Sequence, residues 1–244
     1  MNYELLSGLF IIFDLDGTIF HGKAVWLDAT VRFLDKMNIP VPNETELLKS
    51  LGLRLDVYIR NTLPVDADFV AARALFDDIL HEAIVVRGEL FPGVYDAVAE
   101  LYADGCELAV CSNSPEMYIK TVLESSGLSS MISYYCSTES YDSKAEAMRA
   151  AARGDVPRFV HSEPRNRLSR PSRDTNMNES QQKLVLAIGD THGDIEAARE
   201  NGYISIAAMY GYGNKSMLAS ADYFANTPSD IVNCVRSAAR DSNP

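Results

Sequence analysis

The stretch FIIFDLDGTIF, residues 10–20, decides the fold of this chain. It overlaps a short apolar run, residues 9–13, whose β-branched and aromatic side chains are typical of a buried parallel strand. The run ends in two carboxylates, Asp14 and Asp16, followed by Gly17. Because side chains alternate along a strand, both acids would point the same way, at the strand end where parallel sheets bind ligands. Adjacent acids repel, so the pair indicates a neighbouring cation; the alternative is an ordinary Asp-Gly turn.

The composition limits the classes of partner that we expect. The chain has 244 residues, of which 47% are hydrophobic, so it can bury a core domain and a smaller insert. Its formal net charge of -12 argues against a nucleic-acid polymer or an anionic membrane surface as the main partner. A phosphate site in such a chain would need local positive charge. The first residues lack the basic segment of a signal peptide, and no apolar run reaches membrane-spanning length.

The four cysteines are typical of a reducing compartment. They show neither a CxxC pair nor the spacing of a metal site, so we expect reduced thiols, mostly in the core, and a cytoplasmic location. These cysteines are Cys106, Cys111, Cys136 and Cys234.

Short apolar runs that end in small or polar residues recur along the chain, and helical patterns lie beside them. The runs are residues 106–111, 184–188 and 204–208, and the helical patterns are residues 93–104, 115–126, 143–152 and 194–201. Strands that alternate with helices predict an α/β fold, with a Rossmann-like parallel sheet core and helices on both faces. The strand ends would then form one crevice, where residues far apart in sequence can meet.

Residues 22–88 differ from this alternation, because they carry amphipathic helical patterns and little strand character. We expect an inserted all-helical cap domain there, and a core domain made of residues 1–21 and 89–244. The helical patterns of the insert are residues 25–37, 44–51, 54–62 and 67–86. Residues 154–183 hold six Lys or Arg, three Pro and a single aromatic residue, so we expect a flexible surface loop within the core.

A second acidic motif is AIGDTHGDIEAA, residues 187–198, in which Asp190 and Asp194 are four positions apart across a strand-to-helix turn. With Asp14, they would bring three carboxylates from two strand ends together, a ligand set that suits Mg²⁺. The alternative is helix N-capping by Thr191 or Asp194, which can coexist with metal binding.

Two further signals concern phosphate. Ser112 and Asn113, in VCSNSPEMYIK, end a predicted strand and precede a helix, where a hydroxyl and exposed amides can hold a phosphate. The alternative is an ordinary turn and cap. Lys144 begins another helical pattern, although cations are not favoured at a helix N-terminus. A nearby cluster of carboxylates would explain it; the alternative is a lone surface lysine.

Together these motifs, in the order DxDGT, strand-Ser-Asn, Lys and GDxxxD, resemble the haloacid dehalogenase superfamily of phosphohydrolases over nearly the whole chain. The helical insert directly after the first motif resembles the cap of the phosphoglycolate phosphatase-like branch. The resemblance implies a Mg²⁺-dependent phosphatase that hydrolyses a small phosphorylated metabolite.

The resemblance also implies the roles of the acids. Asp14 would be the nucleophile that forms an aspartyl-phosphate, and Asp16 the general acid and then the base. Mg²⁺ would be held by the side chains of Asp14 and Asp190 and by the backbone carbonyl of Asp16. Asp194 would support the metal's waters or orient Lys144.

For phosphate and substrate, the resemblance implies that Ser112, Asn113 and Lys144 hold the transferring phosphoryl group and offset its charge. Arg54, in a segment that resembles the cap loop reaching the active site, could bind a substrate carboxylate or a second phosphate. The alternative is a solvent-exposed arginine at a helix start.

Several alternatives stay open from the sequence. A sugar phosphomutase shares all four motifs and would need a bisphosphate activator. A non-enzymatic phosphate- or partner-binding protein on this fold would usually have lost one of the acids. A dehalogenase would lack Asp16. The physiological substrate is not readable, and the surface helices of the cap could pack in a homodimer.

Overall fold

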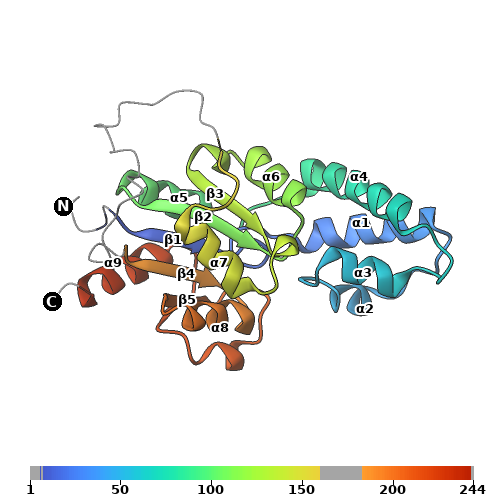
Figure 1. Cartoon of the computed structure of the whole chain (residues 1–244). Coiled ribbons are helices and arrows are strands. Elements are labelled where there is room, and N and C mark those ends of the chain that lie inside the picture. The colour runs from blue at the N-terminus through green and yellow to red at the C-terminus, as the bar shows by residue number, and fades with distance from the viewer. Residues whose placement is uncertain (1–5, 7, 160–182, 243–244) are drawn as a thin grey trace.

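The computed structural model describes residue 6, residues 8–159 and residues 183–242. Among these residues, six strands form one sheet in the order β3-β2-β1-β4-β5-β6, and every neighbouring pair is parallel (Figure 1). The strands are β1 (Phe10–Phe13), β2 (Glu107–Ser112), β3 (Ile132–Ser137), β4 (Val185–Gly189), β5 (Ile204–Ala208) and β6 (Tyr223–Ala225).

Helices cover both faces of this sheet, as the alternation along β1 shows. Ile11 and Phe13 pack in one cluster with apolar side chains of α5, α6 and α9, whereas Phe10 and Ile12 pack in another with α7 and α8. The helices of the core are α5 (Val94–Ala103), α6 (Glu116–Ser125), α7 (Lys144–Arg153), α8 (His192–Glu200) and α9 (Asp230–Asp241), with short 3-10 helices at η1 (Leu128–Ser130), η2 (Thr138–Ser140) and η3 (Lys215–Leu218). Burial on both faces explains why the strands are almost continuously apolar, and the predicted fold class is confirmed.

The inserted cap is helical, as predicted. Its helices are α1 (Lys23–Lys36), α2 (Glu44–Leu48), α3 (Leu55–Thr62) and α4 (Phe69–Arg87). They enclose an aromatic cluster in which Phe33 and Phe76 have ring centroids 4.9 Å apart, and Trp26 and Tyr58 have centroids 5.0 Å apart. Edge-to-face aromatic packing of this kind stabilises the cap part of an apolar cluster that continues onto one face of the sheet. The domain boundaries at residues 22 and 88 stay a prediction.

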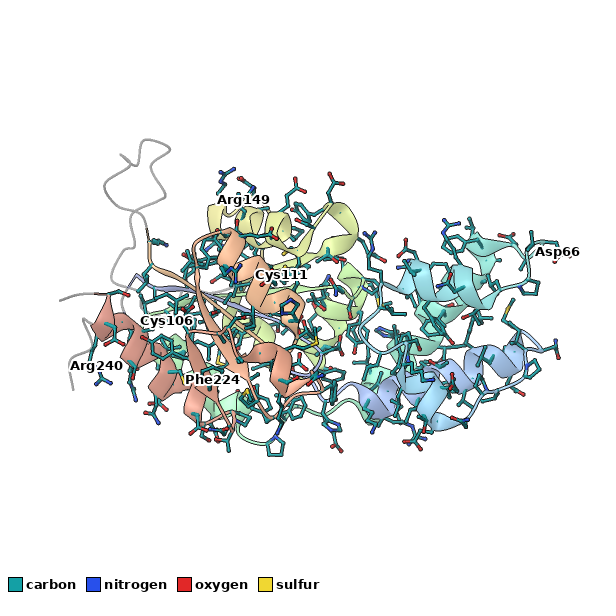
Figure 2. All side chains as sticks on the ribbon, turned by 90° about the horizontal axis from the view of Figure 1, so that it is seen from below. Asp66, Cys106, Cys111, Arg149, Phe224 and Arg240 are labelled. Carbon is teal, nitrogen blue, oxygen red and sulfur yellow. The ribbon has the colours of Figure 1, made fainter. Side chains whose placement is uncertain are left out.

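The strands of the core run toward the cap. Cys106 lies just before β2 and Cys111 near its end, and in Figure 2 Cys111 is the nearer of the two to Asp66 at the tip of the cap. Arg240, in α9, lies at the opposite end of the molecule (Figure 2). The carboxyl ends of the strands therefore face the cap, which is where a parallel sheet binds its ligands.

One strand was missed. The sequence analysis predicted no strand at Ile132–Ser137, yet these residues form β3 at the edge of the sheet and are all buried. The segment contains two serines and two tyrosines, so it lacks the continuous apolar character of its neighbours. Other bounds differ by at most three residues; α8, for example, begins at His192 rather than at residue 194.

The loop predicted at residues 154–183 lies mostly outside the described residues. Gly154 ends α7 in the left-handed conformation, with φ 76°, and Arg158 forms an isolated bridge with Tyr134 of β3. All four cysteines carry free thiols, and three of them are buried, as expected. Within the described residues, no helix is both long enough and apolar enough to span a bilayer.

Candidate active site

Three acids meet at the ends of β1 and β4. Phe13 pairs with Ile188 in the sheet, and the Asp14 N–H donates to the Ile188 carbonyl at 2.8 Å, so Asp14 continues the register of β1 beside β4. Asp190 follows β4 directly, and Asp194 lies in the first turn of α8. One carboxylate oxygen from each of the three acids lies within 4.8 Å of the others, and all three residues are buried. The parallel register thus brings together residues 176 positions apart in sequence, from Asp14 to Asp190.

Lys144 supplies the positive charge of this cluster. Its ammonium group lies 2.5 Å from Asp14 Oδ1 and also pairs with Asp194 Oδ1. Burial by itself would lower the pKa of Lys144, but the charges of Asp14 and Asp194 outweigh it and hold the pKa well above its ordinary value. Lys144 therefore stays protonated, and the acids explain why a cation lies at the first position of α7.

The surroundings of Asp14 disfavour its charged form. Burial raises its pKa well above the ordinary value, Lys144 opposes that shift, and the charges of Asp194 and Asp190 add to it. A further cation at this place would offset the repulsion among the acids and favour the ionised form of Asp14.

The two carboxylate oxygens of Asp190 differ in their hydrogen bonding, and this difference bears on whether a divalent cation fits the site. Its Oδ2 accepts hydrogen bonds from the N–H groups of Tyr212 at 2.7 Å and Gly213 at 3.1 Å. Its Oδ1 is buried and has no hydrogen-bond partner. Burial raises the pKa of Asp190 to about 6, with the charge of Asp194 adding to the shift and the two N–H groups opposing it. A buried, unpartnered carboxylate oxygen beside two further acids fits a hard cation such as Mg²⁺.

The segments around Asp190 approach it so closely that only glycine fits. Gly17 has φ 89°, and a Cβ there would lie 2.3 Å from Asp190 Oδ2. A Cβ at Gly213 would lie 1.7 Å from the Asp190 carbonyl oxygen. The loop after β5 therefore presents its backbone N–H groups to Asp190, which side chains at these positions would prevent.

Asp194 both caps α8 and belongs to the cluster. Its Oδ2 accepts hydrogen bonds from the Thr191 N–H at 2.9 Å and the Thr191 hydroxyl at 2.7 Å, and the two residues form a capping box. Its Oδ1 faces Lys144. The two interpretations of this motif, capping and site residue, hold together because each uses a different oxygen.

The Asp16 carboxylate lies outside the three-acid cluster. Its Oδ1 accepts a hydrogen bond from the Tyr118 hydroxyl at 2.6 Å, and its Oδ2 accepts one from the Ser114 hydroxyl at 2.8 Å. Burial raises the pKa of Asp16, while these two hydrogen bonds and the charge of Lys144 oppose the shift. Burial also raises the pKa of Tyr118 well above its ordinary value, with the charge of Asp16 adding to it, so Tyr118 stays a donor.

Ser112 and Asn113 lie where the phosphate motif was predicted, at the end of β2 beside β1. The Ser112 hydroxyl accepts a hydrogen bond from the Ser114 N–H at 3.1 Å. The Asn113 side chain is engaged elsewhere: its Oδ1 accepts from the Thr138 hydroxyl at 2.9 Å, and its Nδ2 donates to the Gly52 carbonyl of the cap at 3.4 Å. Its carboxamide thus links core and cap, and the predicted phosphate contact of its side chain would require these bonds to open.

Arg54 lies in the cap, directly before α3, and its side chain is 38% exposed. Its Nε lies 3.5 Å from Asp56 Oδ1. Both of its neighbours in the chain, Leu53 and Leu55, line a narrow cavity between cap and core that Asp16 borders. The structure therefore brings the Arg54 segment to the site, with the guanidinium turned to Asp56.

Sequence reasoning missed Ser114, Tyr118, Tyr212 and Gly213. Ser114 and Tyr118 follow Asn113 in the quoted SNSPEMYIK segment, and a hydroxyl one helical turn beyond a predicted site is the signal that could have found Tyr118. The glycines of MYGYG, after the strand at Ile204–Ala208, were a signal for a close backbone approach.

Comparison with known proteins agrees with this geometry. Residues 11–153 match the family model of haloacid dehalogenase-like hydrolases. The phosphoglycolate phosphatase of Salmonella typhimurium is 26% identical over 91% of this chain and 90% of its own length. The structure of a predicted phosphoglycolate phosphatase from Haemophilus somnus superimposes with a TM-score of 0.72 at 21% identity, over 94% of this chain and 98% of its own.

A protein from Thermotoga maritima, provisionally assigned as a β-phosphoglucomutase, shares the fold with a TM-score of 0.65 at 15% identity, over 93% of this chain and 98% of its own. The family match covers more than half of the chain, and the chain therefore belongs to the haloacid dehalogenase-like hydrolase family. It is an enzyme of the phosphohydrolase class, similar to the phosphoglycolate phosphatases, and the expected family and branch are confirmed.

Proposed function

We propose that this chain is a Mg²⁺-dependent phosphatase that hydrolyses a small phosphomonoester through an aspartyl-phosphate on Asp14. The observation that carries the proposal is the buried cluster at the ends of β1 and β4. There Asp14 contacts Lys144 and lies beside Asp190, whose Oδ1 has no partner. A nucleophilic carboxylate, a fixed cation and a vacant ligand oxygen are what phosphoryl transfer to a carboxylate requires.

In the first half of the reaction, an Asp14 oxygen forms a bond to phosphorus while the bond from phosphorus to the leaving oxygen breaks. Lys144 and the Ser112 hydroxyl would hold the transferring phosphoryl oxygens, together with backbone N–H groups after β2. Asp16 gives its proton to the leaving oxygen, which departs as an alcohol. Mg²⁺, held by Asp14, Asp190 and the Asp16 carbonyl with support from Asp194, would supply positive charge that favours the ionised carboxylates.

In the second half, Asp16 has become a carboxylate and can take a proton from water. The hydroxide so formed attacks the phosphorus of the aspartyl-phosphate, and the bond from phosphorus to the Asp14 oxygen breaks. Inorganic phosphate leaves, Asp14 is regenerated as a carboxylate, and Asp16 is again protonated. One side chain thus serves as acid and then as base.

The names of the relatives favour a small phosphorylated metabolite as substrate, and phosphoglycolate is the first to test. Arg54 would recognise a substrate carboxylate or second phosphate by exchanging its contact with Asp56 for the substrate. We infer that residues 22–88 form the domain that carries this specificity and that residues 1–21 and 89–244 carry the chemistry. The cytoplasmic location and a homodimer formed through the cap stay predictions.

The test is phosphate release from a panel of small phosphomonoesters, with Mg²⁺ and with EDTA. We expect Mg²⁺-dependent release by the wild type, and a loss of about 10³-fold or more in Asp14→Asn, which lacks the nucleophile. Asp66→Asn is the matched control, because it makes the same change at the exposed tip of the cap (Figure 2).

The same panel separates the alternatives. Conversion of a sugar phosphate into its isomer without phosphate release, and only when a sugar bisphosphate is added as activator, would favour the phosphomutase, which turns over through a phosphorylated enzyme. If no substrate gave either phosphate release or isomerisation, the phosphatase and mutase proposals would both be wrong.

A further inference from the structure

The hydrogen bonds of Asp16 carry an inference that rests on the acid role proposed for this residue. Its two carboxylate oxygens each accept a hydrogen bond from a different side chain of the segment that follows β2. The Tyr118 hydroxyl donates to Oδ1 at 2.6 Å, and the Ser114 hydroxyl donates to Oδ2 at 2.8 Å. A carboxylate bound at both oxygens cannot turn about its Cβ–Cγ bond without losing a hydrogen bond, so the two donors set its orientation.

The Tyr118 side chain is itself held in place by packing. It is 5% exposed, and its ring packs edge-on against Phe20 with centroids 6.0 Å apart. Gly22, directly before the first cap helix, lies so close that a Cβ there would be 2.9 Å from the Tyr118 hydroxyl and 2.4 Å from Asp16 Oδ1. Only a glycine at this position leaves room for the hydrogen-bonded pair beside the start of the cap.

This hydrogen-bonded group borders the space that a leaving group would use. Asp16, Ser114 and Tyr118 line the narrow cavity between core and cap, and Trp26 and Leu53 of the cap line it from the other side. An acid that protonates a leaving oxygen must lie within hydrogen-bond reach of it, so the orientation of the Asp16 carboxyl group decides whether the proton is delivered.

We propose that Tyr118 and Ser114 are positioning residues that orient Asp16 for proton transfer to the leaving oxygen. The proton moves from the Asp16 carboxyl group to that oxygen as its bond to phosphorus breaks, and the electron pair of the bond stays on the oxygen. A protonated carboxyl group keeps enough lone pairs to accept from both hydroxyls while it donates. Tyr118 and Ser114 keep their own protons throughout and act through Asp16, without contact to the phosphoryl group or the leaving oxygen.

The test compares leaving groups that do and do not need a proton. Tyr118→Phe removes only the hydroxyl and leaves the ring that packs on Phe20. With the best alkyl phosphomonoester of the panel, we expect kcat/KM to fall about tenfold through kcat, with KM within about twofold. With p-nitrophenyl phosphate, whose phenolate leaves unprotonated, kcat/KM should fall less than about twofold. The ratio kcat/KM is used because it excludes the later hydrolysis of the phosphoenzyme.

The controls separate positioning from a structural effect. Tyr223→Phe makes the same change in another tyrosine–carboxylate hydrogen bond, to Asp241 at 2.5 Å on the exposed surface, and should leave both substrates unchanged. Ser114→Ala should reproduce the selective loss, and Ser114→Thr, which keeps the hydroxyl, should restore most of the activity with the alkyl substrate.

Two results would overturn the positioning role: an unchanged kcat/KM of Tyr118→Phe with the alkyl substrate, or an equal loss with both leaving groups. Either would leave the proposed phosphatase standing, provided that the wild type releases phosphate with Mg²⁺. A wild type without Mg²⁺-dependent release would remove the proposed function and this inference with it.

Discussion

The core and the cap contribute different side chains to the same site. Charged side chains lie at the carboxyl ends of the core strands, and mainly apolar side chains lie on the facing surface of the cap. At the carboxyl ends of the strands, the buried acids Asp14, Asp190 and Asp194 lie within 4.8 Å of one another, and Lys144 pairs with Asp14 and Asp194. The cap side of the neighbouring cavity is formed by Trp26 and leucines. Arg54, the charged residue that the sequence analysis singled out in the cap, is partly exposed and pairs with its own helix start at Asp56.

The difference teaches how reaction and specificity are divided in this molecule. Replacing one member of the buried charge cluster at the strand ends costs free energy, because it leaves a neighbouring charge without its partner. An apolar cap surface with an exposed arginine carries no such constraint, since loops at the surface tolerate change. Core substitutions should therefore abolish the reaction, and cap substitutions should change which substrate is bound.

After Asp14→Asn, the largest effect is expected from Lys144→Met, which leaves Asp14 and Asp194 buried without their cation. We expect kcat/KM to fall by about 10²–10³-fold, since one donor to the transferring phosphoryl group is lost along with the cation that holds Asp14. Steady-state kinetics with the best substrate measure this. Lys183→Met, which removes an ion pair with Glu107 at 2.6 Å, is the control and should keep its activity. A loss below about tenfold in Lys144→Met would contradict the assignment.

A smaller effect is expected in the stability of the metal-free chain. The folded state raises the pKa of Asp190 from 3.8 to about 6, so folding favours its protonated form. Its contribution to stability is present below pH 3.8 and is lost as the pH rises through about 6. As the pH rises from 3.8 to neutral, we expect the free energy of unfolding of the wild type to fall by up to about 3 kcal/mol relative to that of Asp190→Asn.

Urea unfolding at a series of pH values in EDTA measures this, and saturating Mg²⁺ is the comparison. Because the cation favours the ionised acids, Mg²⁺ should stabilise the wild type at neutral pH more than at pH 5. Curves that run parallel for the wild type and Asp190→Asn would show that Asp190 is not the group responsible.

The smallest effect is expected in the cap. Arg54→Ala should raise KM about tenfold, equivalent to about 1.4 kcal/mol, for a substrate that carries a second anionic group, and should leave kcat within about threefold. Arg60→Ala is the matched control, since Arg60 lies over the Phe69 ring at 4.0 Å within the cap. If KM is the same in both variants, the specificity of the cap lies elsewhere.

The positions of Asp14 and Asp190 could be predicted because each directly follows a strand signal. Alternation along β1 and the GDxxxD turn after β4 are local patterns, and parallel sheets bring their ends together whatever lies between. The position of Lys144 was predictable for the same reason, since a cation at a helix N-terminus needs an acid. Strand β3 was not predicted, because its serines and tyrosines interrupt the apolar pattern by which a buried strand is recognised.

The hydrogen-bond partners of the acids were not predictable. Ser114 and Tyr118 donate to Asp16 because the start of α6 lies beside the loop that follows β1. Asn113 donates to the Gly52 carbonyl because this part of the cap lies against the end of β2. A hydrogen bond depends on atomic positions to within a few tenths of an ångström, which a sequence does not give. The sequence also offers several acceptors for each donor and does not say which one it contacts.

By itself, the sequence determined the alternation of strands and helices, the helical insert, and two acids at strand ends, Asp14 and Asp190, with Lys144 and Asp194 at helix starts. It did so because side-chain periodicity and turn residues act over a few neighbours. Only the tertiary structure decided which oxygen of each acid is paired, which stays free for a cation and how Asp16 is oriented. Those choices follow from the parallel register of β1 with β4, from the packing of α6 and from the loop after β5. These contacts join residues from 22 to more than 100 positions apart.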